Sequence, residues 1–229
     1  MEEFQIILDC AKKLGHTVEI LSSIKSGKEA SVFSALLDGR LVAVKIYTNP
    51  EERAFQNSNP YLAGKFYKRA SEERAVGKGN TFGRRLKQDS WITREFFMLQ
   101  KLHKAGAVIP EPILHIENAL FLELLGDDEV IANRLIDTVL SGEEAVLAFQ
   151  SVLKSTKIFW DLGIVHGDLS PYNILWWKSQ PYIIDFPQAI DVRTHPDARV
   201  FLERDLKNIV KYFRKFITVD FEEVLSRFL

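Results

Sequence analysis

The chain has 229 residues, of which 46% are hydrophobic and 27% charged, and its net charge is −1 at pH 7. This length allows one large domain or two small lobes, and the balanced charge excludes a protein that binds polyanions over its whole surface. The single cysteine, Cys10, excludes an intramolecular disulfide and argues against a cysteine-based zinc site. The N-terminus is acidic and no apolar run reaches the roughly 20 residues of a membrane span. We therefore expect a cytoplasmic protein without a signal peptide or membrane segment.

The first half of the chain is predicted to be rich in β-structure. Apolar residues with helical spacing predict a helix over residues 3–14 that ends at Gly15. Two β-rich runs around Asp38-Gly39 predict a hairpin over residues 30–47.

A long segment without periodicity follows, and it is predicted to be a loop over residues 48–90. Its part from 61 to 87 carries eight Lys or Arg residues against two Glu, a local balance of +6. An apolar stripe then predicts a helix from about Ser90 to Lys104, closed by Gly106.

The second half is predicted to be mainly helical. Two strands are expected within residues 112–125, and Gly126-Asp127-Asp128 is a candidate boundary between lobes. Helical patterns then follow at about 130–140, 143–162, 197–215 and 220–228, interrupted by the segment 166–190.

Lys45 and Glu95 are charged residues on apolar faces. Lys45 lies inside the second strand of the hairpin, and Glu95 lies on the apolar stripe of the following helix. Because an unpaired buried charge is costly, the two residues could neutralise each other. A strand lysine held by a helix glutamate presents its ammonium to the phosphates of ATP. The alternative is that Lys45 reaches solvent at a strand end and that Glu95 is exposed.

The stretch SGKEASVF, residues 26–33, is predicted to form a glycine-containing turn before the strand that leads to Lys45. Such a turn can direct backbone N–H groups at phosphate. It matches neither GxxxxGK[ST] nor GxGxxG, so an ordinary turn is the alternative.

The stretch HGDLSPYNILWWKSQPYIIDF places Asp168, Asn173 and Asp185 in an order typical of phosphoryl transfer. That reaction needs a carboxylate near the substrate hydroxyl and oxygen ligands for Mg²⁺. Asp168 suits the first role, and Asn173 and Asp185 suit the second. The alternative is ordinary turn and strand-end chemistry, which Asp and Asn also favour.

Two further residues are predicted to support this segment. Asp205 shares a helix stripe with Leu202, Leu206 and Ile209, so a buried carboxylate there would accept backbone N–H bonds from the loop around Asp168. The five histidines show no metal-ligand spacing, and His166 is interpreted as an anchor of the same loop.

Together these motifs resemble the RIO family of atypical protein kinases over about residues 24–229. The resemblance is carried by SGKEASVF, VAVK at 42–45, HGDLSPYN at 166–173, IDFPQA at 184–189 and FLERDLKNI at 201–209. It implies an α+β, trimmed bilobal kinase-like fold that binds ATP between a β-rich N-lobe with one principal helix and a mainly helical C-lobe. The single domain would span residues 1–229, with the N-lobe at about 16–125, the hinge at about 123–128 and the C-lobe at about 129–229.

The resemblance also implies roles for individual residues. Asp168 would be the catalytic base, Asn173 and Asp185 would bind Mg²⁺ or Mn²⁺, and Asp185 could itself accept a phosphate as phosphoaspartate. The residues implied to bind ATP are Ser26, Gly27, Lys28, Glu29, Ala30, Ser31, Lys45, Glu95, Glu123 and Leu125, the last two through hinge backbone groups. Asp205 and His166 would give structural support.

The motifs resemble two RIO subfamilies. SGKEASVF and HGDLSPYN are similar to the first subfamily and its archaeal or bacterial relatives, whereas IDFPQ is similar to the second. Gly167 departs from the first pattern, in which many members have Ala. Pro187 replaces the glycine of Asp-Phe-Gly and should stiffen the backbone there. Only 20 residues separate Asp185 from Asp205, so no long activation segment is expected.

Three functions are compatible with these residues. The first is an ATP-dependent serine/threonine kinase, with autophosphorylation, or an ATPase switch, which by resemblance would act in small ribosomal subunit maturation. The second is a small-molecule kinase of the aminoglycoside or choline type, because such enzymes share the HGDxxxxN and IDF core. The third is a non-enzymatic module that binds pre-ribosomal RNA through the basic segment 61–87.

Overall fold

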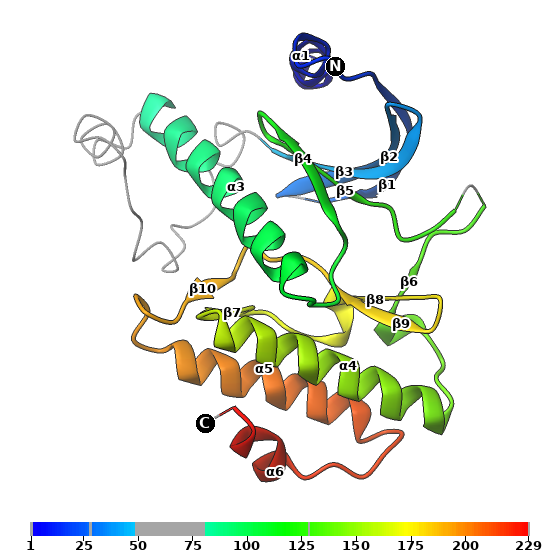
Figure 1. Cartoon of the computed structure of the whole chain (residues 1–229), viewed down its shortest axis with the longest axis vertical. Helices are drawn as coiled ribbons and strands as arrows, with labels where there is room; N and C mark the ends of the chain where they lie inside the picture. Colours follow the sequence, from blue (N-terminus) through cyan, green and yellow to red (C-terminus); the bar gives the residue numbers. More distant parts are fainter. Residues whose placement is uncertain (1, 28, 49–80, 128, 229) are drawn as a thin grey trace. The chain divides into compact units, whose positions relative to one another are not determined.

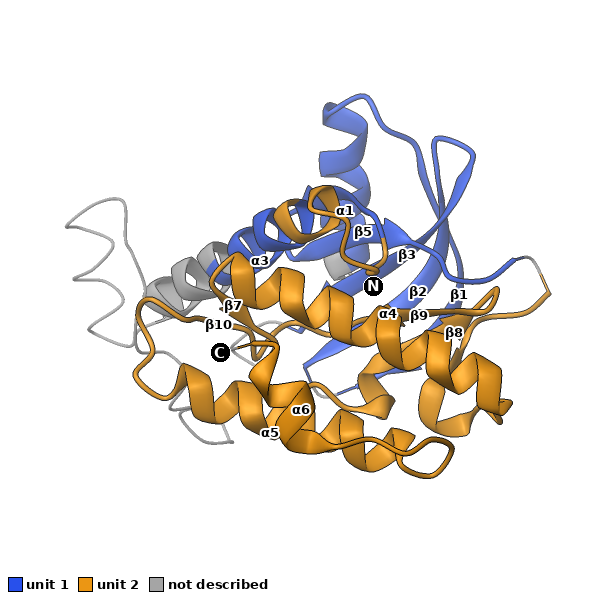
Figure 2. Cartoon of the chain, turned by 60° about the horizontal axis from the view of Figure 1, so that its bottom comes forward, with its two compact units in different colours: residues 1–59, 65–100, 111–127 blue, residues 60–64, 101–110, 128–229 orange. Residues whose placement is uncertain are grey.

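The structure is a computed structural model that describes the backbone of residues 2–27, 29–48, 81–127 and 129–228. The chain divides into two compact units (Figure 2), and the described part of unit 1 comprises residues 2–27, 29–48, 81–100 and 111–127. Unit 2 includes residues 101–110 and 129–228. No helix in these ranges has an apolar stretch long enough to cross a membrane.

Unit 1 is built on an antiparallel five-stranded sheet with the order β1-β2-β3-β5-β4 (Figure 1). Its strands are β1 (Val18–Ser26), β2 (Ala30–Leu37), β3 (Arg40–Tyr47), β4 (Pro112–Ile116) and β5 (Ala119–Glu123). The predicted hairpin and the two strands within 112–125 are confirmed, whereas β1 was not predicted.

The turn between β2 and β3 explains why the hairpin could be predicted. Asp38 and Gly39 both have positive φ, 51° and 81°, which suits the twist of a two-residue hairpin connection. On one face of β3, Val42 and Val44 are buried in an apolar cluster that includes Ile7 of helix α1 (Glu2–Lys13). Lys45 therefore belongs to the opposite face of the sheet.

Helix α3 (Thr81–Lys104) begins earlier than predicted. The expected loop over 48–90 is wrong for residues 81–90, which are helical. Their long polar side chains favour a helix by intrinsic propensity, but they show no apolar periodicity. The basic residues 61–80 lie outside the described residues, as do the side chains of 81–90.

Unit 2 is mainly helical, as predicted. Helices α4 (Gly142–Asp161) and α5 (Ala198–Phe213) pack against each other, and α6 (Phe221–Ser226) packs on α5 (Figure 1). A capping box of Ser141 and Glu144 begins α4. Two small sheets complete the unit, with the strands β6 (Asn133–Arg134), β7 (Ile164–Val165), β8 (Ile174–Trp177), β9 (Gln180–Ile183) and β10 (Ile190–Asp191).

The helix predicted over 130–140 is wrong, because this segment forms strand β6 and one short 3₁₀ turn, Leu135–Asp137. Strand β6 pairs with β8, about 40 residues later in the chain, and sequence periodicity does not reveal such pairing. Leu135 is buried while Val139 is 93% exposed, so the apolar residues do not line one helical face.

Candidate active site

Lys45 of β3 and Glu95 of α3 face each other in unit 1. Lys45 Nζ lies 3.6 Å from Glu95 Oε1, and Glu95 is only 4% exposed. The predicted pairing of these two residues is present, so the alternative of an exposed Glu95 is wrong. The other carboxylate oxygen of Glu95 accepts a hydrogen bond of 2.5 Å from Tyr47 Oη.

The stretch 26–31 forms the tight connection between β1 and β2. Gly27 N–H donates to the Ala30 carbonyl at 3.1 Å, and the hydroxyls of Ser26 and Ser31 lie 3.3 Å apart across the strand pair. The Glu29 carbonyl accepts a bond from Thr48 N–H at 3.0 Å, which ties the turn to the end of the strand that carries Lys45. Lys28 lies outside the described residues. The connection is thus a turn, as predicted, while its phosphate-binding role stays a prediction.

Glu123 is fixed at the end of β5 by two bonds to the chain before β4. Its N–H donates to the Glu111 carbonyl at 2.8 Å, and its carboxylate accepts Glu111 N–H at 3.1 Å. The N–H of Glu123 is therefore engaged within unit 1, and its predicted adenine contact stays a prediction. Leu125 is buried, and its hinge role also stays a prediction.

In unit 2 the loop around Asp168 is held by three polar residues of α5, Arg204, Asp205 and Asn208. The two oxygens of Asp205 accept Gly167 N–H at 2.8 Å and Leu169 N–H at 3.0 Å, as predicted. Arg204 donates to the Gly167 carbonyl, and Asn208 donates to the Leu169 carbonyl at 3.2 Å. Both neighbours of Asp168 are therefore fixed through their N–H and C=O groups, while Asp168 itself is exposed.

Burial gives Asp205 an unusual protonation equilibrium. The residue is 1% exposed, and desolvation raises its pKa to about 7. The bonds from Gly167 and Leu169 N–H and the charge of Arg204 lower the pKa, but they do so by less than burial raises it.

His166 connects the loop to the segment before Asp185. Its Nδ1 accepts Asp168 N–H at 3.3 Å, so its proton is assigned to Nε2, which lies 3.0 Å from the Ile184 carbonyl. Ile184 N–H in turn donates to the Asn173 carbonyl at 3.0 Å. The anchoring role predicted for His166 agrees with these bonds.

Asn173 is oriented by two bonds from its amide nitrogen. Nδ2 donates to the carbonyl of Asp168 at 2.8 Å and to its carboxylate at 3.1 Å. This arrangement fixes the direction of the Asp168 carboxylate and leaves Asn173 Oδ1 as the oxygen suited to a metal ion.

These oxygens suit Mg²⁺. Asp185 is exposed two residues beyond the end of β9, and its backbone is bonded through Ile184 to Asn173. Within the described ranges no three His, Cys, Asp or Glu residues gather around a common point for a metal. Mg²⁺ is commonly bound by one or two carboxylates together with water and substrate phosphates.

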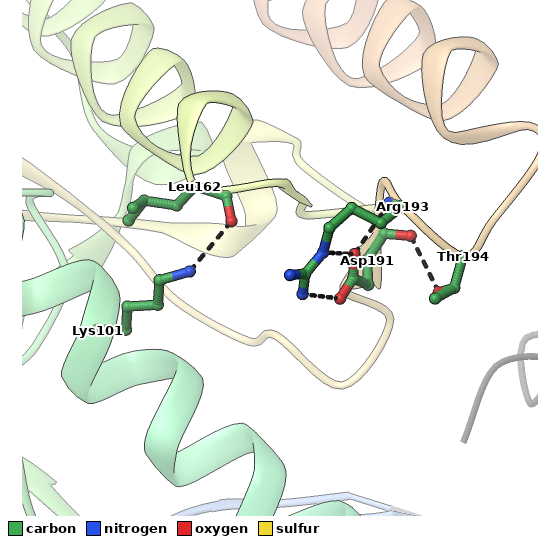
Figure 3. Close-up of polar contacts among 5 residues, drawn as sticks. All are labelled: Lys101, Leu162, Asp191, Arg193 and Thr194. Carbon is green, nitrogen blue, oxygen red and sulfur yellow. Dashed lines mark hydrogen bonds and ion pairs between the residues drawn. The ribbon is translucent and has the colours of Figure 1, made fainter. Parts of the chain in front are cut away.

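The segment from Asp185 to α5 is short, and its residues make polar contacts within unit 2 (Figure 3). Strand β10 pairs with β7, and Val192 N–H donates to the Gly163 carbonyl at 2.9 Å. The Asp191 carboxylate accepts bonds from the backbone N–H and the guanidinium of Arg193. The guanidinium bond and the Asp191 charge raise the pKa of Arg193. The Asp191 carbonyl accepts a bond from Thr194 Oγ1 at 3.3 Å. Nearby, Lys101 Nζ donates to the Leu162 carbonyl at the end of α4. Residues 186–197 thus contain no long activation segment, as predicted.

Sequence reasoning missed three residues of this arrangement: Tyr47, Arg204 and Asn208. Tyr47 shares a strand face with Lys45, because the two are two positions apart. Arg204 and Asn208 lie one residue before and three residues after Asp205 on the same helix. Proximity to a predicted site residue was the available signal in each case, but it does not identify the bonding partner.

The comparisons with known proteins all indicate the same protein family. A model described as the RIO domain matches residues 31–224. The RIO-type serine/threonine-protein kinase Rio1 of Haloferax volcanii is 34% identical over 203 residues, which cover 88% of this chain and 65% of that protein. The serine/threonine-protein kinase RIO1 of Homo sapiens is 32% identical over 203 residues, which cover 88% of this chain and 34% of that protein.

Among solved structures, the Rio2 kinase–ADP/Mg²⁺–phosphoaspartate complex from Chaetomium thermophilum is similar, with a TM-score of 0.65 and 18% identity. The match covers 98% of this chain and 65% of that one. It confirms the predicted α+β kinase-like fold. The chain spans only about a third to two thirds of the length of these relatives.

Proposed function

The chain belongs to the RIO family, and on that basis we propose that it is an ATP- and Mg²⁺-dependent serine/threonine kinase. The observation that carries this proposal is the hydrogen-bond network of unit 2. It orients the carboxylate of Asp168 through Asn173 and joins both to the segment that ends in Asp185. The small-molecule kinase alternative shares the HGDxxxxN and IDF core, but the family match favours a protein kinase.

In this proposal both units form one catalytic domain, with the N-lobe at about 16–125, the hinge at about 123–128 and the C-lobe at about 129–229. Unit 1 contributes the phosphate-binding pair of Lys45 and Glu95. Unit 2 contributes Asp168 as base and Asn173 and Asp185 as ligands of Mg²⁺. The remaining residues that we propose for ATP binding are Ser26, Gly27, Lys28, Glu29, Ala30, Ser31, Glu123 and Leu125.

The transfer step uses the exposed carboxylate of Asp168. The hydroxyl oxygen of a Ser or Thr forms a bond to the γ-phosphorus, and the bond between that phosphorus and the β,γ-bridging oxygen breaks, so that ADP leaves. Asp168 takes the hydroxyl proton, for which the bond from Asn173 Nδ2 orients it. Bound Mg²⁺ would neutralise charge on the phosphates.

A second acceptor of the phosphoryl group is Asp185. A carboxylate has no proton to lose, so transfer to Asp185 would not need Asp168 as a base. Hydrolysis of the resulting acyl phosphate would return the carboxylate and release phosphate, which amounts to an ATPase cycle. The solved Rio2 complex contains phosphoaspartate, which supports this route as part of the proposal.

The test is to incubate the purified chain with Mg²⁺ and ATP labelled at the γ-phosphate, and to measure ADP release and protein-bound label. Asp168→Asn should lose transfer to Ser or Thr while it still binds ATP, and Asp185→Asn should lose Mg²⁺-dependent ATP binding. Asp161→Asn is a matched control, since Asp161 forms an exposed pair with Lys157. Unchanged hydroxyl transfer in Asp168→Asn would refute its role as base.

The chemistry of the label separates the two acceptors. A label that hydroxylamine removes, and that lies on the proteolytic peptide containing Asp185, would identify phosphoaspartate. A hydroxylamine-stable label would identify a Ser or Thr phosphate.

We also propose a role in small ribosomal subunit maturation, supported by the family and by the +6 balance of residues 61–87. RNA that co-purifies with the chain should contain small-subunit precursors. Charge reversal at Arg84 and Arg85 should weaken that association and make its salt dependence shallower.

A further inference from the structure

We propose that Tyr47 is a positioning residue for the Lys45–Glu95 pair, and that it keeps the lysine ammonium placed for phosphate. This inference rests on the proposed role of Lys45 in nucleotide binding. It assigns to Tyr47 a function beyond packing, because its side chain contacts both members of the pair.

The contacts of Glu95 are unequal. Its Oε2 accepts a 2.5 Å bond from Tyr47 Oη, whereas its Oε1 lies 3.6 Å from Lys45 Nζ. The first distance is that of a short, charge-assisted hydrogen bond, and the second is that of an ion pair beyond hydrogen-bond length. The position of the carboxylate is therefore set more by Tyr47 than by Lys45.

Tyr47 can set that position because it is itself fixed. It is 1% exposed, and its ring meets that of Trp91 edge to face, with centroids 4.9 Å apart. Its backbone makes two bonds with Asn118: Tyr47 N–H donates to the Asn118 carbonyl at 2.9 Å, and Asn118 Nδ2 donates to the Tyr47 carbonyl at 2.7 Å.

The electrostatic state of Tyr47 suits a donor. Burial, together with the nearby Glu95 charge, raises its pKa well above the usual value for tyrosine, so the hydroxyl keeps its proton. Lys45 Nζ lies 4.9 Å from the centroid of the same ring, within the range of a cation–π contact. Tyr47 thus donates to the anion through its hydroxyl and lies next to the cation. The charge of Lys45 and its hydrogen bond to Tyr47 lower the pKa of Tyr47, but by less than burial raises it.

This arrangement has a consequence for phosphate binding. A buried carboxylate that depended on Lys45 for its hydrogen bonds would draw the ammonium into a direct bond. Because Tyr47 supplies a neutral donor, Lys45 Nζ can direct protons towards a phosphate while Glu95 remains hydrogen-bonded. Loss of the Tyr47 hydroxyl should therefore weaken the binding of phosphate groups without changing the binding of a nucleoside.

The experiment measures dissociation constants of Mg·ATP and adenosine by calorimetry for the wild-type chain and for Tyr47→Phe. The matched control is Tyr212→Phe, because Tyr212 is also buried and its hydroxyl donates to the Leu135 carbonyl at 2.7 Å in unit 2. We expect Tyr47→Phe to weaken ATP binding about tenfold, the effect of a hydrogen bond to a charged group, and to leave adenosine binding unchanged. Tyr212→Phe should leave the ratio of the two constants unchanged. Equal weakening of ATP and adenosine in Tyr47→Phe, or no weakening of ATP, would overturn the inference.

If the Tyr47→Phe variant does not fold, the same substitution can be tested in a chain that already carries Glu95→Gln. Glu95→Gln removes the buried charge, so Tyr47→Phe added to Glu95→Gln should cause no further loss of ATP binding. A further tenfold loss in that background would show that Tyr47 acts without Glu95 and would contradict the inference.

Lys45→Met separates this inference from the proposed function. If Lys45→Met loses the preference for ATP over adenosine and Tyr47→Phe keeps it, then only the role of Tyr47 is wrong. If Lys45→Met also keeps the preference, the nucleotide role of Lys45 itself is wrong.

Discussion

Replacing Asp205 with asparagine should remove a pH dependence of stability that the wild-type chain carries. The carboxyl is buried between α5 and the Asp168 loop, and its pKa is about 7 in the folded chain against 3.8 for an ordinary aspartate. At pH values between 3.8 and about 7, the folded state therefore keeps a proton on Asp205 that the unfolded state has released. By linkage, the free energy of unfolding falls as pH rises towards 7 and becomes constant above it.

The magnitude follows from the same two pKa values. Between pH 5 and pH 8 the folded state releases nearly a full proton from Asp205, and the unfolded state is already ionised throughout. Integration gives a loss of roughly 2 to 3 kcal/mol in the free energy of unfolding over this window. Asparagine has nearly the same shape and does not titrate, so Asp205→Asn should lack this term.

The assay is urea unfolding of both chains at half-unit steps from pH 5 to pH 8. The difference between them cancels the histidines and other groups that titrate in this range. Glu203→Gln is a control on the same helix, because Glu203 pairs only with Arg199 and Lys207 among the residues described, at 3.3 and 3.9 Å. A wild-type minus Asp205→Asn difference that stays constant with pH would refute the reasoning. It would mean that the bonds from Gly167 and Leu169 keep the carboxyl ionised despite burial.

Two further predictions concern stability alone. In urea unfolding, Gly167→Ala should destabilise the chain more than Gly39→Ala does, by about 1 to 3 kcal/mol. A Cβ at position 167 would lie 2.5 Å from the Gln188 carbonyl oxygen, whereas a Cβ at position 39 would meet no atom within 4 Å. Equal losses would show that only the positive φ common to both glycines matters. Ser141→Ala should lower the free energy of unfolding by about 1 kcal/mol, because it removes the N-cap of α4. Ser170→Ala should lower it by less, because the Ser170 side chain makes no cap hydrogen bond. Thermal unfolding of the two variants measures the difference. A smaller loss for Ser141→Ala than for Ser170→Ala would contradict this cap energy.

The parts of the fold that the sequence predicted are those with a local physical cause. The hairpin at Asp38-Gly39 depends on two neighbouring residues with positive φ. The ends of α1 and α4 depend on Gly15 and Gly163, which also have positive φ. The error at 130–140 has the opposite origin, since strand β6 exists through its pairing with β8.

The candidate site shows the same distinction between features with a local cause and features that depend on distant residues. Lys45, Glu95 and Asp205 could be predicted to be buried and paired because a charge on an apolar face requires a partner. The identity of the partner could be predicted only where the chemistry allowed few choices. Tyr47 escaped prediction because a tyrosine at the end of a strand is ordinary, and its hydroxyl gains significance only from the 2.5 Å distance to Glu95.

The absence of glycine after Asp185-Phe186 has a structural reason. Positive φ falls on Asp185 itself, at 69°, in a region that aspartate tolerates better than most residues. A turn follows at once, in which Ala189 N–H donates to the Phe186 carbonyl at 2.9 Å. Pro187 occupies the second position of this turn, where proline is favoured because its fixed φ matches and no N–H is required. Phe186 anchors the turn, with its ring centroid 4.7 Å from that of His166.

This turn also explains the glycine at 167, because the two motifs are in contact. Gly167 has a φ of 82°, and the Gln188 carbonyl occupies the space that its Cβ would fill. A chain that places the turn of Pro187 and Gln188 this close to the Asp168 loop therefore requires glycine at 167. Gly167 and the turn of Pro187 and Gln188 are thus sterically coupled. A substitution at either position should be tolerated better when the other changes with it.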